Sequence, residues 1–237
     1  MLECILKFIY PDRCVVCGEV MEFGSRDYIC EKCAKVNKFS FDNRCSVCGR
    51  PLKERVSSEG ICRSCAEEEI YFSSGLAIFP FSKVRNSVHN LKYYGGRINA
   101  EPYAEIMYDY MKSSGKISAL DFDAITFVPM HPDRERKRGY NQARLIAEKL
   151  AEITGKPCEV LLEKTVLTKP QSRLTGEERM LNVKNTFAVI NSSEVKGKRI
   201  LIADDVLTTG STINECSRML MAGGAKKVMF ITFAYAD

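Results

Sequence analysis

The sequence lacks any apolar run that approaches the roughly 20 residues needed by a membrane-spanning helix. Its first ten residues have no basic segment and no cleavage site, so we do not expect them to act as a secretory signal. The phosphate-binding motif G-x-x-x-x-G-K-[ST] is absent as well. These absences predict a cytoplasmic protein without membrane insertion, and they exclude a common type of nucleotide-phosphate site.

The composition is that of a globular chain with a modest positive charge. Its 237 residues are enough for one sizeable α/β domain and a small additional module. Apolar residues make up 45% and charged residues 27%, as in soluble globular proteins. A formal charge of +5 permits nucleic acid or polyphosphate partners but does not require them. The apolar spacing of the first ten residues predicts a short packing helix that ends at Pro11.

Cysteine is concentrated at the start of the chain, where eight of the eleven cysteines form four C-x-x-C pairs. Two such pairs supply four thiolates, which complete a tetrahedral Zn²⁺ shell and leave no open position for catalysis. A disulfide framework is the alternative, but it belongs to an oxidising compartment. We therefore expect two structural Zn²⁺ ions per chain. The ligands are Cys14, Cys17, Cys30, Cys33, Cys45, Cys48, Cys62 and Cys65.

The four pairs also repeat in kind. The segment Cys14–Gly18 resembles Cys45–Gly49, and both place a glycine after the second cysteine. Four pairs can be shared between two ions in three ways, and this internal duplication favours the sequential way, in which each half closes its own site. We expect residues 1–70 to form this small zinc-binding domain. The remaining cysteines, Cys4, Cys158 and Cys216, are expected to be small buried hydrophobes.

One stretch combines an apolar strand, two carboxylates and a hydroxyl-rich turn. The apolar run Ile200–Ala203 ends at Asp204 and Asp205, and a helical pattern follows the turn. The first N–H groups of a helix attract anions, whereas the carboxylates suit ribose hydroxyls or a water-held Mg²⁺. The stretch therefore predicts a site for a phosphorylated sugar. Its turn residues are Thr208, Thr209, Gly210, Ser211 and Thr212.

A second candidate segment is basic. The strand predicted over Ala124–Val128 ends in a proline-bounded loop of residues 129–142, which carries five basic side chains. Because ligands of α/β sheets bind at the carboxyl ends of strands, this loop is a candidate polyanion site. A solvated charge run is the alternative. The candidate ligand contacts here are His131, Arg134 and Arg138.

The rest of the chain alternates between helical and strand patterns. Strands are predicted over 73–81, 187–190 and 228–234, and helices over 84–94, 101–112, 143–153 and 211–222. This alternation is typical of a mostly parallel sheet flanked by helices, here over residues 71–237. The basic segment Thr165–Lys184 is either a mobile flap over the ligand or a surface excursion. We expect His89 to be a surface or packing histidine.

The stretch 199–212 resembles the 5-phosphoribosyl 1-pyrophosphate (PRPP) signature of type I phosphoribosyltransferases: strand, acidic pair, then T-T-G-S-T. The resemblance implies a phosphoribosyltransferase-type α/β fold. It also implies that Asp204 and Asp205 are catalytic and hold the ribose hydroxyls, while Thr208–Thr212 bind the 5′-phosphate. In that fold the basic segment around His131 carries the pyrophosphate together with Mg²⁺.

Four features in order resemble the ComF/GntX family: the cysteine pairs as a double zinc ribbon, Leu91-Lys92-Tyr93, the block from His131 to Gln142, and the PRPP signature. This resemblance covers essentially the whole chain. It implies an association with natural competence, in which the protein works beside a helicase-like translocase on incoming single-stranded DNA.

One departure bears on activity. Purine-pathway amidophosphoribosyltransferases expose a catalytic cysteine at the N-terminus, whereas residue 2 here is a leucine, so we do not expect glutamine-dependent amination. Two hypotheses remain. In one, the protein binds Mg²⁺–PRPP and single-stranded DNA as an accessory in DNA uptake. In the other, it is an active phosphoribosyltransferase acting on an amine or base. The intact acidic pair predicts PRPP binding in both.

Overall fold

The computed structural model describes residues 13–22, 28–36, 41, 43–52, 60–93, 100–167 and 183–237. The helix predicted over the first ten residues, together with Cys4, lies outside them. So does most of the basic segment 165–184, including Arg173 and Arg179. Among the described residues, no helix has the length and apolar character needed to cross a bilayer.

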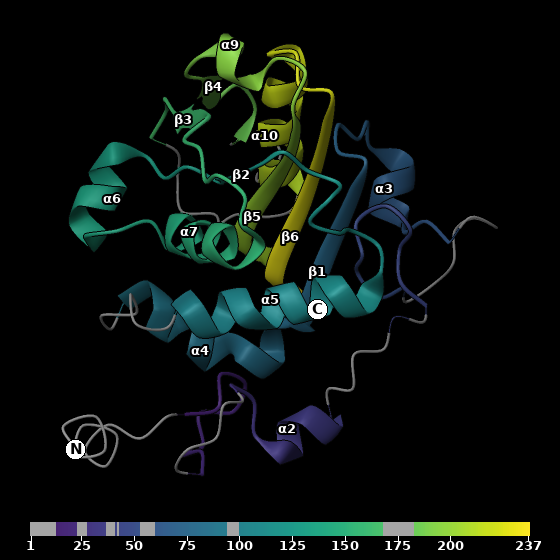
Figure 1. The fold of residues 1–237 in the computed structure, drawn as a ribbon, viewed down its shortest axis with the longest axis vertical. Helices are drawn as coiled ribbons and strands as arrows, with labels where there is room; N and C mark the ends of the chain where they lie inside the picture. The colour runs from purple at the N-terminus through teal and green to yellow at the C-terminus, as the bar shows by residue number, and fades with distance from the viewer. Residues whose placement is uncertain are drawn as a thin grey trace.

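A four-stranded parallel sheet forms the centre of the molecule, in the order β1-β6-β5-β2 (Figure 1). The strands are β1 (Ser74–Pro80), β6 (Lys227–Tyr235), β5 (Arg199–Leu207) and β2 (Ala124–Phe127). Because helices cover both faces, β6 is buried over all but its end residues. The predicted α/β class with a mostly parallel sheet is therefore confirmed.

Helices α4 (Phe81–Tyr93), α5 (Ala100–Ser114) and α7 (Gln142–Thr154) pack on one face, and α10 (Ser211–Ala222) packs on the other. The period of two along β5 divides its apolar residues between the two faces. Leu201 and Ala203 join the core under α5 and α7, while Ile200 and Ile202 join the core under α10. Strand β5 therefore contributes side chains to the cores on both faces of the sheet.

Strand β5 continues beyond the predicted end at Ala203. The reason is its partner, because β6 is long enough to pair with Val206 and Leu207 as well. The acidic pair therefore lies inside the strand and not after it. Successive side chains of a strand point to opposite faces, so Asp204 and Asp205 enter different environments.

The loop predicted over residues 129–142 contains a helix, α6 (Pro132–Arg138), which corrects the sequence interpretation. Pro132 stands at the first helical position, where its missing N–H costs nothing. The Nδ1 of His131 accepts the N–H of Asp133 at 3.2 Å, which caps the start. Gly139, with φ of 88°, ends the helix in the left-handed conformation. The proline opens a helix here instead of bounding a loop.

Several short elements complete the fold. The strand predicted over 187–190 is β4 (Phe187–Val189), and it pairs antiparallel with β3 (Leu162–Lys164), which the sequence did not predict. These two strands lie at either end of the segment 165–184. The short helices are α2 (Glu31–Val36), α3 (Arg63–Glu67) and α9 (Ser192–Val195).

Candidate functional site

A cleft of about 640 Å³ lies at the carboxyl ends of β2 and β5. Eight of the ten residues predicted for the sugar-phosphate and polyanion sites line it. They are His131, Arg134, Arg138, Asp204, Asp205, Thr208, Gly210 and Thr212. Thr209 and Ser211 do not line the cleft; their hydroxyl groups lie 2.8 Å apart, and Ser211 is buried. The two segments that the sequence proposed separately therefore line one cleft.

Further side chains with donor groups also line the cleft, although the sequence analysis assigned none of them to a ligand site. They are Arg85, His89, Lys92, Asn141, Gln142 and Lys164. Lys92 and Gln142 stand in the segments that carry the ComF/GntX resemblance, which is the signal that could have found them. His89 is exposed, as expected, but it lies on the wall of this cleft.

Asp205 is held in a buried ion pair. The Nζ of Lys92 lies 2.5 Å from its Oδ2, and the Nε2 of Gln142 donates to its Oδ1 at 3.2 Å. Burial alone would raise the pKa of this carboxyl, but the charge of Lys92 and the two hydrogen bonds outweigh burial and lower its pKa. Asp205 is therefore an ionised group with its partners already in place.

Asp204 stands in a different environment. Burial, followed by repulsion from Asp205, raises its pKa well above the usual range for an aspartate. Its Oδ1 accepts the backbone N–H of Asp205 at 2.8 Å. On the same side of the cleft, burial lowers the pKa of Lys164, and the charge of Arg134 adds to this effect. Of the two carboxylates, Asp204 is the one without a basic partner at contact distance among the described residues, and so the one available to a ligand.

The block Arg138–Gln142 positions the cleft wall. Tyr140 donates its hydroxyl to the carbonyl of Leu91 at 2.6 Å and so fixes α4. The Nδ2 of Asn141 donates to the carbonyl of Val128 at 3.0 Å, and its Oδ1 caps α7. Arg138 donates to the Oε1 of Gln142 at 2.7 Å, which connects α6 to the amide that holds Asp205.

Helix α6 presents its basic residues in two directions. Arg134 and Arg138, four positions apart, are half-buried and line the cleft. Arg136 and Lys137 are exposed, and Arg136 pairs with Asp133 on the surface. The basic segment therefore offers one set of cations to the cleft and another to the solvent.

Residues 208–212, which the sequence predicts to bind phosphate and which we call the phosphate loop, join β5 to α10. Gly210 has φ of 99°, a left-handed conformation that a side chain would strain. On its outer side, Arg50 donates to the carbonyls of Thr208 and Thr209 at 2.9 and 3.0 Å. The loop is therefore supported by a residue of the cysteine-rich segment, far from it in the sequence.

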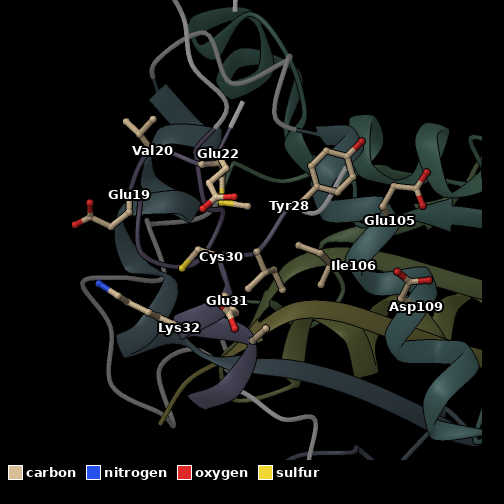
Figure 2. Close-up of a pocket in the computed structure, with 13 residues that line it drawn as sticks. Glu19, Val20, Glu22, Tyr28, Cys30, Glu31, Lys32, Glu105, Ile106 and Asp109 are labelled. Carbon is tan, nitrogen blue, oxygen red and sulfur yellow. The ribbon is translucent and has the colours of Figure 1, made fainter. Parts of the chain in front are cut away.

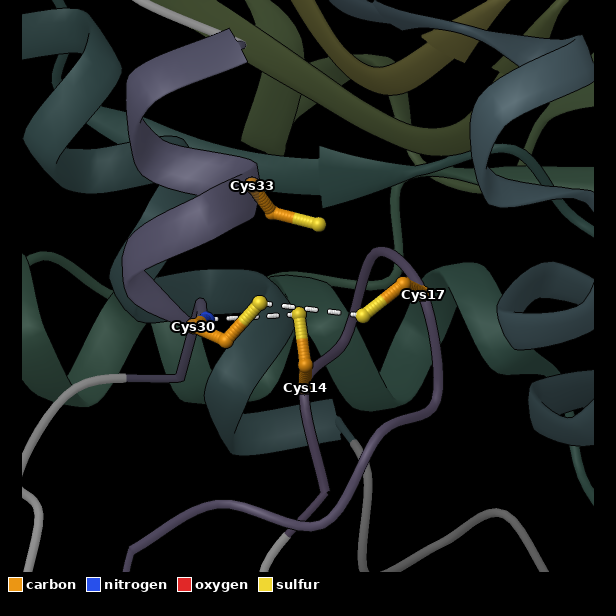
Figure 3. A group of neighbouring side chains, drawn as sticks. All are labelled: Cys14, Cys17, Cys30 and Cys33. Atoms are coloured by element: carbon orange, nitrogen blue, oxygen red, sulfur yellow. Dashed lines mark hydrogen bonds between the residues drawn. The ribbon is translucent and has the colours of Figure 1, made fainter.

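The eight paired cysteines form two clusters, in each of which the four Sγ atoms lie within 4.8 Å of one another. We call the segment Cys14–Cys33 the first ribbon and Cys45–Cys65 the second ribbon. Figure 3 shows the side chains of the first cluster gathering around one point. Four sulfurs held about 2.3 Å from a tetrahedral ion lie about 3.8 Å apart. The pairs Cys17–Cys30 and Cys48–Cys62 have Sγ–Sγ distances of 3.7 Å, which fits that shell.

Backbone N–H groups near the sulfur atoms also support the assignment of the two cysteine clusters as zinc sites. The N–H of Cys30 points at the Sγ of Cys14 at 3.3 Å, and that of Cys62 at the Sγ of Cys45 at 3.4 Å, as suits thiolate acceptors. The sequential pairing is confirmed, and the two clusters fit two structural zinc sites. Cys216 is fully buried, as expected, whereas Cys158 is only half-buried.

A second cavity, of about 890 Å³, lies between the first ribbon and α5 (Figure 2). Among the described residues, its charged side chains are five carboxylates and one lysine, Lys32. The carboxylates are Glu19, Glu22, Glu31, Glu105 and Asp109. A cavity lined in this way repels phosphate groups, so its preference is opposite to that of the cleft at the carboxyl ends of β2 and β5.

Comparison with known families matches residues 5–67 to the double zinc ribbon domain and residues 137–237 to the phosphoribosyl transferase domain. Competence protein F of Haemophilus influenzae is 31% identical over 128 residues, which cover 53% of this chain and 56% of that protein. DNA utilization protein YhgH of Salmonella typhimurium is 31% identical, covering 60% of this chain and 62% of that protein. The chain thus spans less than two thirds of the length of these two relatives.

Competence protein ComFC of Bacillus subtilis is 25% identical over 203 residues, covering 83% of this chain and 79% of that protein. Among solved structures, the glutamine PRPP amidotransferase of B. subtilis has a TM-score of 0.38 at 23% identity, covering 56% of this chain and 25% of that chain. A purine phosphoribosyltransferase of Pyrococcus horikoshii has a TM-score of 0.35 at 15% identity, covering 60% and 82%. With zinc ribbons ahead of a phosphoribosyl transferase domain and competence proteins among its relatives, the chain is similar to ComF-like proteins in both of its parts.

Proposed function

We propose that this protein binds Mg²⁺–PRPP in the cleft between α6 and the start of α10, and that it serves DNA uptake as an accessory that contacts single-stranded DNA. One observation carries the PRPP assignment. The cleft combines an available carboxylate, a hydroxyl-bearing loop at a helix start and two arginines. These groups match the ribose, the 5′-phosphate and the pyrophosphate of one ligand.

Each group has a distinct role in this proposal. Asp204 accepts hydrogen bonds from the ribose hydroxyls and holds Mg²⁺ through water. The phosphate loop binds the 5′-phosphate through its N–H groups and the hydroxyls of Thr208 and Thr212. Arg134 and Arg138 bind the pyrophosphate. When bound, Mg²⁺ neutralises part of the pyrophosphate charge.

The DNA contact is assigned to the exposed side of α6. Arg136 and Lys137 face the solvent beside the cleft, where they suit the backbone phosphates of a strand. The cavity beside the first ribbon is lined by carboxylates and disfavours such a contact. The names of the relatives, competence protein and DNA utilization protein, support this role. A DNA-uptake translocase is the proposed protein partner.

A second candidate function, phosphoribosyl transfer, is favoured by the arginines that line the cleft. In this reaction an amine or base nitrogen forms a bond to C1′ and gives up its proton to the solvent, while the bond from C1′ to pyrophosphate breaks. The leaving group departs with its electron pair, and Arg134 and Arg138 stabilise the charge that develops on it. Release of pyrophosphate from Mg²⁺–PRPP in the presence of amines or bases separates this function from binding alone.

The two carboxylates provide the test of PRPP binding. Asp204→Asn should weaken binding by about 1.5–3 kcal/mol, because a charged acceptor is lost. Wild-type affinity should also fall as the pH drops through the raised pKa of Asp204, at a higher pH than for an ordinary aspartate. Calorimetry with Mg²⁺–PRPP between pH 5 and 8 measures both effects. Equal affinity of wild type and Asp204→Asn would reject the proposed site.

Thermal unfolding without ligand should distinguish Asp204 from Asp205, because their substitutions should change the Tm in opposite directions. The ionised form of Asp204 is disfavoured by folding, so its penalty is present above the raised pKa, and Asp204→Asn should increase Tm at neutral pH. Asp205 has a lowered pKa, so its contribution is present at neutral pH and lost on acidification. Asp205→Asn should therefore decrease Tm, because it leaves Lys92 without its partner.

The proposed DNA contact is tested with the two sets of basic residues that α6 presents, one to the solvent and one to the cleft. Changing Arg136 and Lys137 to alanine should weaken the binding of single-stranded DNA at low salt and leave PRPP affinity unchanged. Changing Arg134 and Arg138 to alanine should weaken PRPP binding and leave the affinity for single-stranded DNA unchanged. Fluorescence anisotropy with an oligonucleotide, over a range of salt concentrations, measures the first effect. If the affinity for single-stranded DNA were unchanged by the substitution of Arg136 and Lys137, α6 would not form the DNA contact.

A further inference from the structure

We propose that Arg50 of the second ribbon positions the phosphate loop, so that the second zinc site sets the affinity of the cleft for the 5′-phosphate end of its ligand. This inference rests on the proposed function, because it names how the same site is organised. It assigns the second ribbon a part in ligand binding beyond its own stability.

The contacts of Arg50 fix the orientation of two peptide groups. Its Nη1 donates to the carbonyl of Thr208 at 2.9 Å, and its Nη2 donates to the carbonyl of Thr209 at 3.0 Å. The C=O and N–H of a trans peptide point in opposite directions. The following N–H groups, those of Thr209 and Gly210, are therefore turned away from the ribbon. Within the described part of the chain, neither of them donates to another group.

The metal-binding turn also fixes the backbone position of Arg50. The N–H of Cys45 donates to the carbonyl of Arg50 at 2.8 Å, and the N–H of Gly49 donates to the carbonyl of Cys45 at 3.0 Å. Gly49 itself is in the left-handed conformation, with φ of 74°. A zinc ion that closes this turn therefore sets the backbone from which the guanidinium reaches the loop. Its planar fork then holds two carbonyls at once, which a lysine cannot reproduce.

Arg50 also lies close enough to act on the ligand by its charge. A Cβ added to Gly210 would stand 3.5 Å from its Nη2, so the guanidinium is in contact with the loop backbone. Arg50 is half-buried, which reduces screening by water. A fixed positive charge behind a loop that binds phosphate adds to the attraction from the helix start.

The first ribbon shows that the arginine is not a requirement of the metal turn. In that ribbon the residue two positions after Cys17 is Glu19, whereas Arg50 stands two positions after Cys48. Glu19 lines the acidic cavity. The two turns share their geometry but carry opposite charges at this position, so the metal-binding turn does not by itself require Arg50.

The experiment compares Arg50→Ala and Arg50→Lys with Arg63→Ala in the zinc-loaded full chain. Arg63 is a matched control, because it lies in the same ribbon with its side chain 80% exposed and pairs with Glu67 on the surface. The probes are Mg²⁺–PRPP, ribose 5-phosphate and pyrophosphate, measured by calorimetry together with zinc content. We expect Arg50→Ala to keep two zinc ions and to lose at least tenfold in affinity for PRPP and ribose 5-phosphate. Pyrophosphate binding should stay within twofold, and Arg50→Lys should be intermediate.

A loss of all three ligands together, or a loss of zinc, would show that Arg50 supports the fold in general, and this would overturn the inference. Unchanged affinity for ribose 5-phosphate would overturn it as well. Hydrogen exchange without ligand keeps the test independent of the proposed function. The amide of Asn214, bonded to the carbonyl of Gly210 at 2.8 Å, should exchange faster in Arg50→Ala and Arg50→Lys than in Arg63→Ala. If wild type fails to bind PRPP, the proposed function falls, and this exchange rate alone decides the positioning role.

Discussion

The two zinc ribbons are built on the same turn but are placed in different surroundings. Gly18 and Gly49 follow their cysteines with φ of 79° and 74°. In the first ribbon, Arg13 donates to the carbonyl of Gly18 at 3.1 Å, and in the second, Arg44 donates to that of Gly49 at 2.8 Å. Their local geometry thus reproduces the duplication seen in the sequence.

Their surroundings differ in depth. In the second ribbon Cys45 and Cys48 are each 1% exposed, and both belong to the core beneath α10. Lys116 clamps this ribbon to the sheet, since its Nζ donates to the carbonyls of Cys45 and Gly75 at 3.2 and 3.0 Å. In the first ribbon Cys17 is exposed. Cys14 of the first ribbon is nevertheless 2% exposed and packs in the core beneath α5, so the two turns differ in depth mainly at their second cysteine.

Removing one zinc ligand from each ribbon should give the largest difference. A structural zinc ion contributes about 10–16 kcal/mol in zinc-finger peptides, which is comparable with the whole stability of a domain, about 5–15 kcal/mol. Cys48→Ser should therefore unfold the domain around the cleft and abolish PRPP binding. Cys17→Ser should lose one zinc ion but keep the cleft. Zinc content, circular dichroism and calorimetry measure these outcomes.

The comparison would fail if both variants behaved alike. Loss of PRPP binding in Cys17→Ser would mean that the first ribbon also supports the cleft. Retained binding in Cys48→Ser would mean that the sheet holds the phosphate loop without the second ribbon.

The two glycines should give the next largest difference. Alanine at either position costs about 1–2 kcal/mol, because the backbone is left-handed. At Gly49 the new Cβ would also stand 2.4 Å from the carbonyl oxygen of Gly75, and this overpacking adds about 1–3 kcal/mol. At Gly18 nothing lies within 4 Å. Denaturant titration of both zinc-loaded variants should find Gly49→Ala less stable than Gly18→Ala. Equal losses would show that the second ribbon can move away from β1.

The smallest difference is expected for two lysines. Lys116→Met keeps the length of the side chain but removes the donor from the carbonyls of Cys45, Val47 and Gly75, which should cost about 1–2 kcal/mol. Lys32 is exposed in the first ribbon, so Lys32→Met should change the stability by less than about 0.5 kcal/mol. Thermal unfolding at fixed zinc concentration distinguishes the two. If Lys116→Met left the stability unchanged, the contacts of Lys116 would not contribute to the difference between the two ribbons.

The sequence predicted what depends on local spacing. Cysteine spacing and repetition were enough for the sequential zinc pairing, and the run from Ile200 to Thr212 was enough for a strand, a turn and a helix. The different environments of Asp204 and Asp205 were not predictable, because they depend on how far β5 pairs with β6 and on Lys92 from a distant helix. The contact of Arg50 with the phosphate loop spans 158 positions, which no local pattern encodes.

Helix α6 was missed for another reason. Its residues are almost all charged, and none of them is buried, so the apolar period that reveals a helix is missing. Its ends nevertheless carry helical signals, with Pro132 at the start and Gly139 after the last residue. Capping residues were the better guide in a segment that packs little against the core.

The strand order has a consequence for assembly during synthesis. β6, the last strand in chain order, lies between β1 and β5, and among the described strands β1 pairs with β6 alone. The ribosome delivers the two ribbons first, so their cysteines can take up metal while the sheet is still incomplete. The N–H of Gly75, which donates to the carbonyl of Val47, and the carbonyl of Ala77, which accepts from Arg44, become fixed only when β6 arrives. Because pairing over such a separation is slow, the support beneath the phosphate loop is among the last parts of the molecule to form.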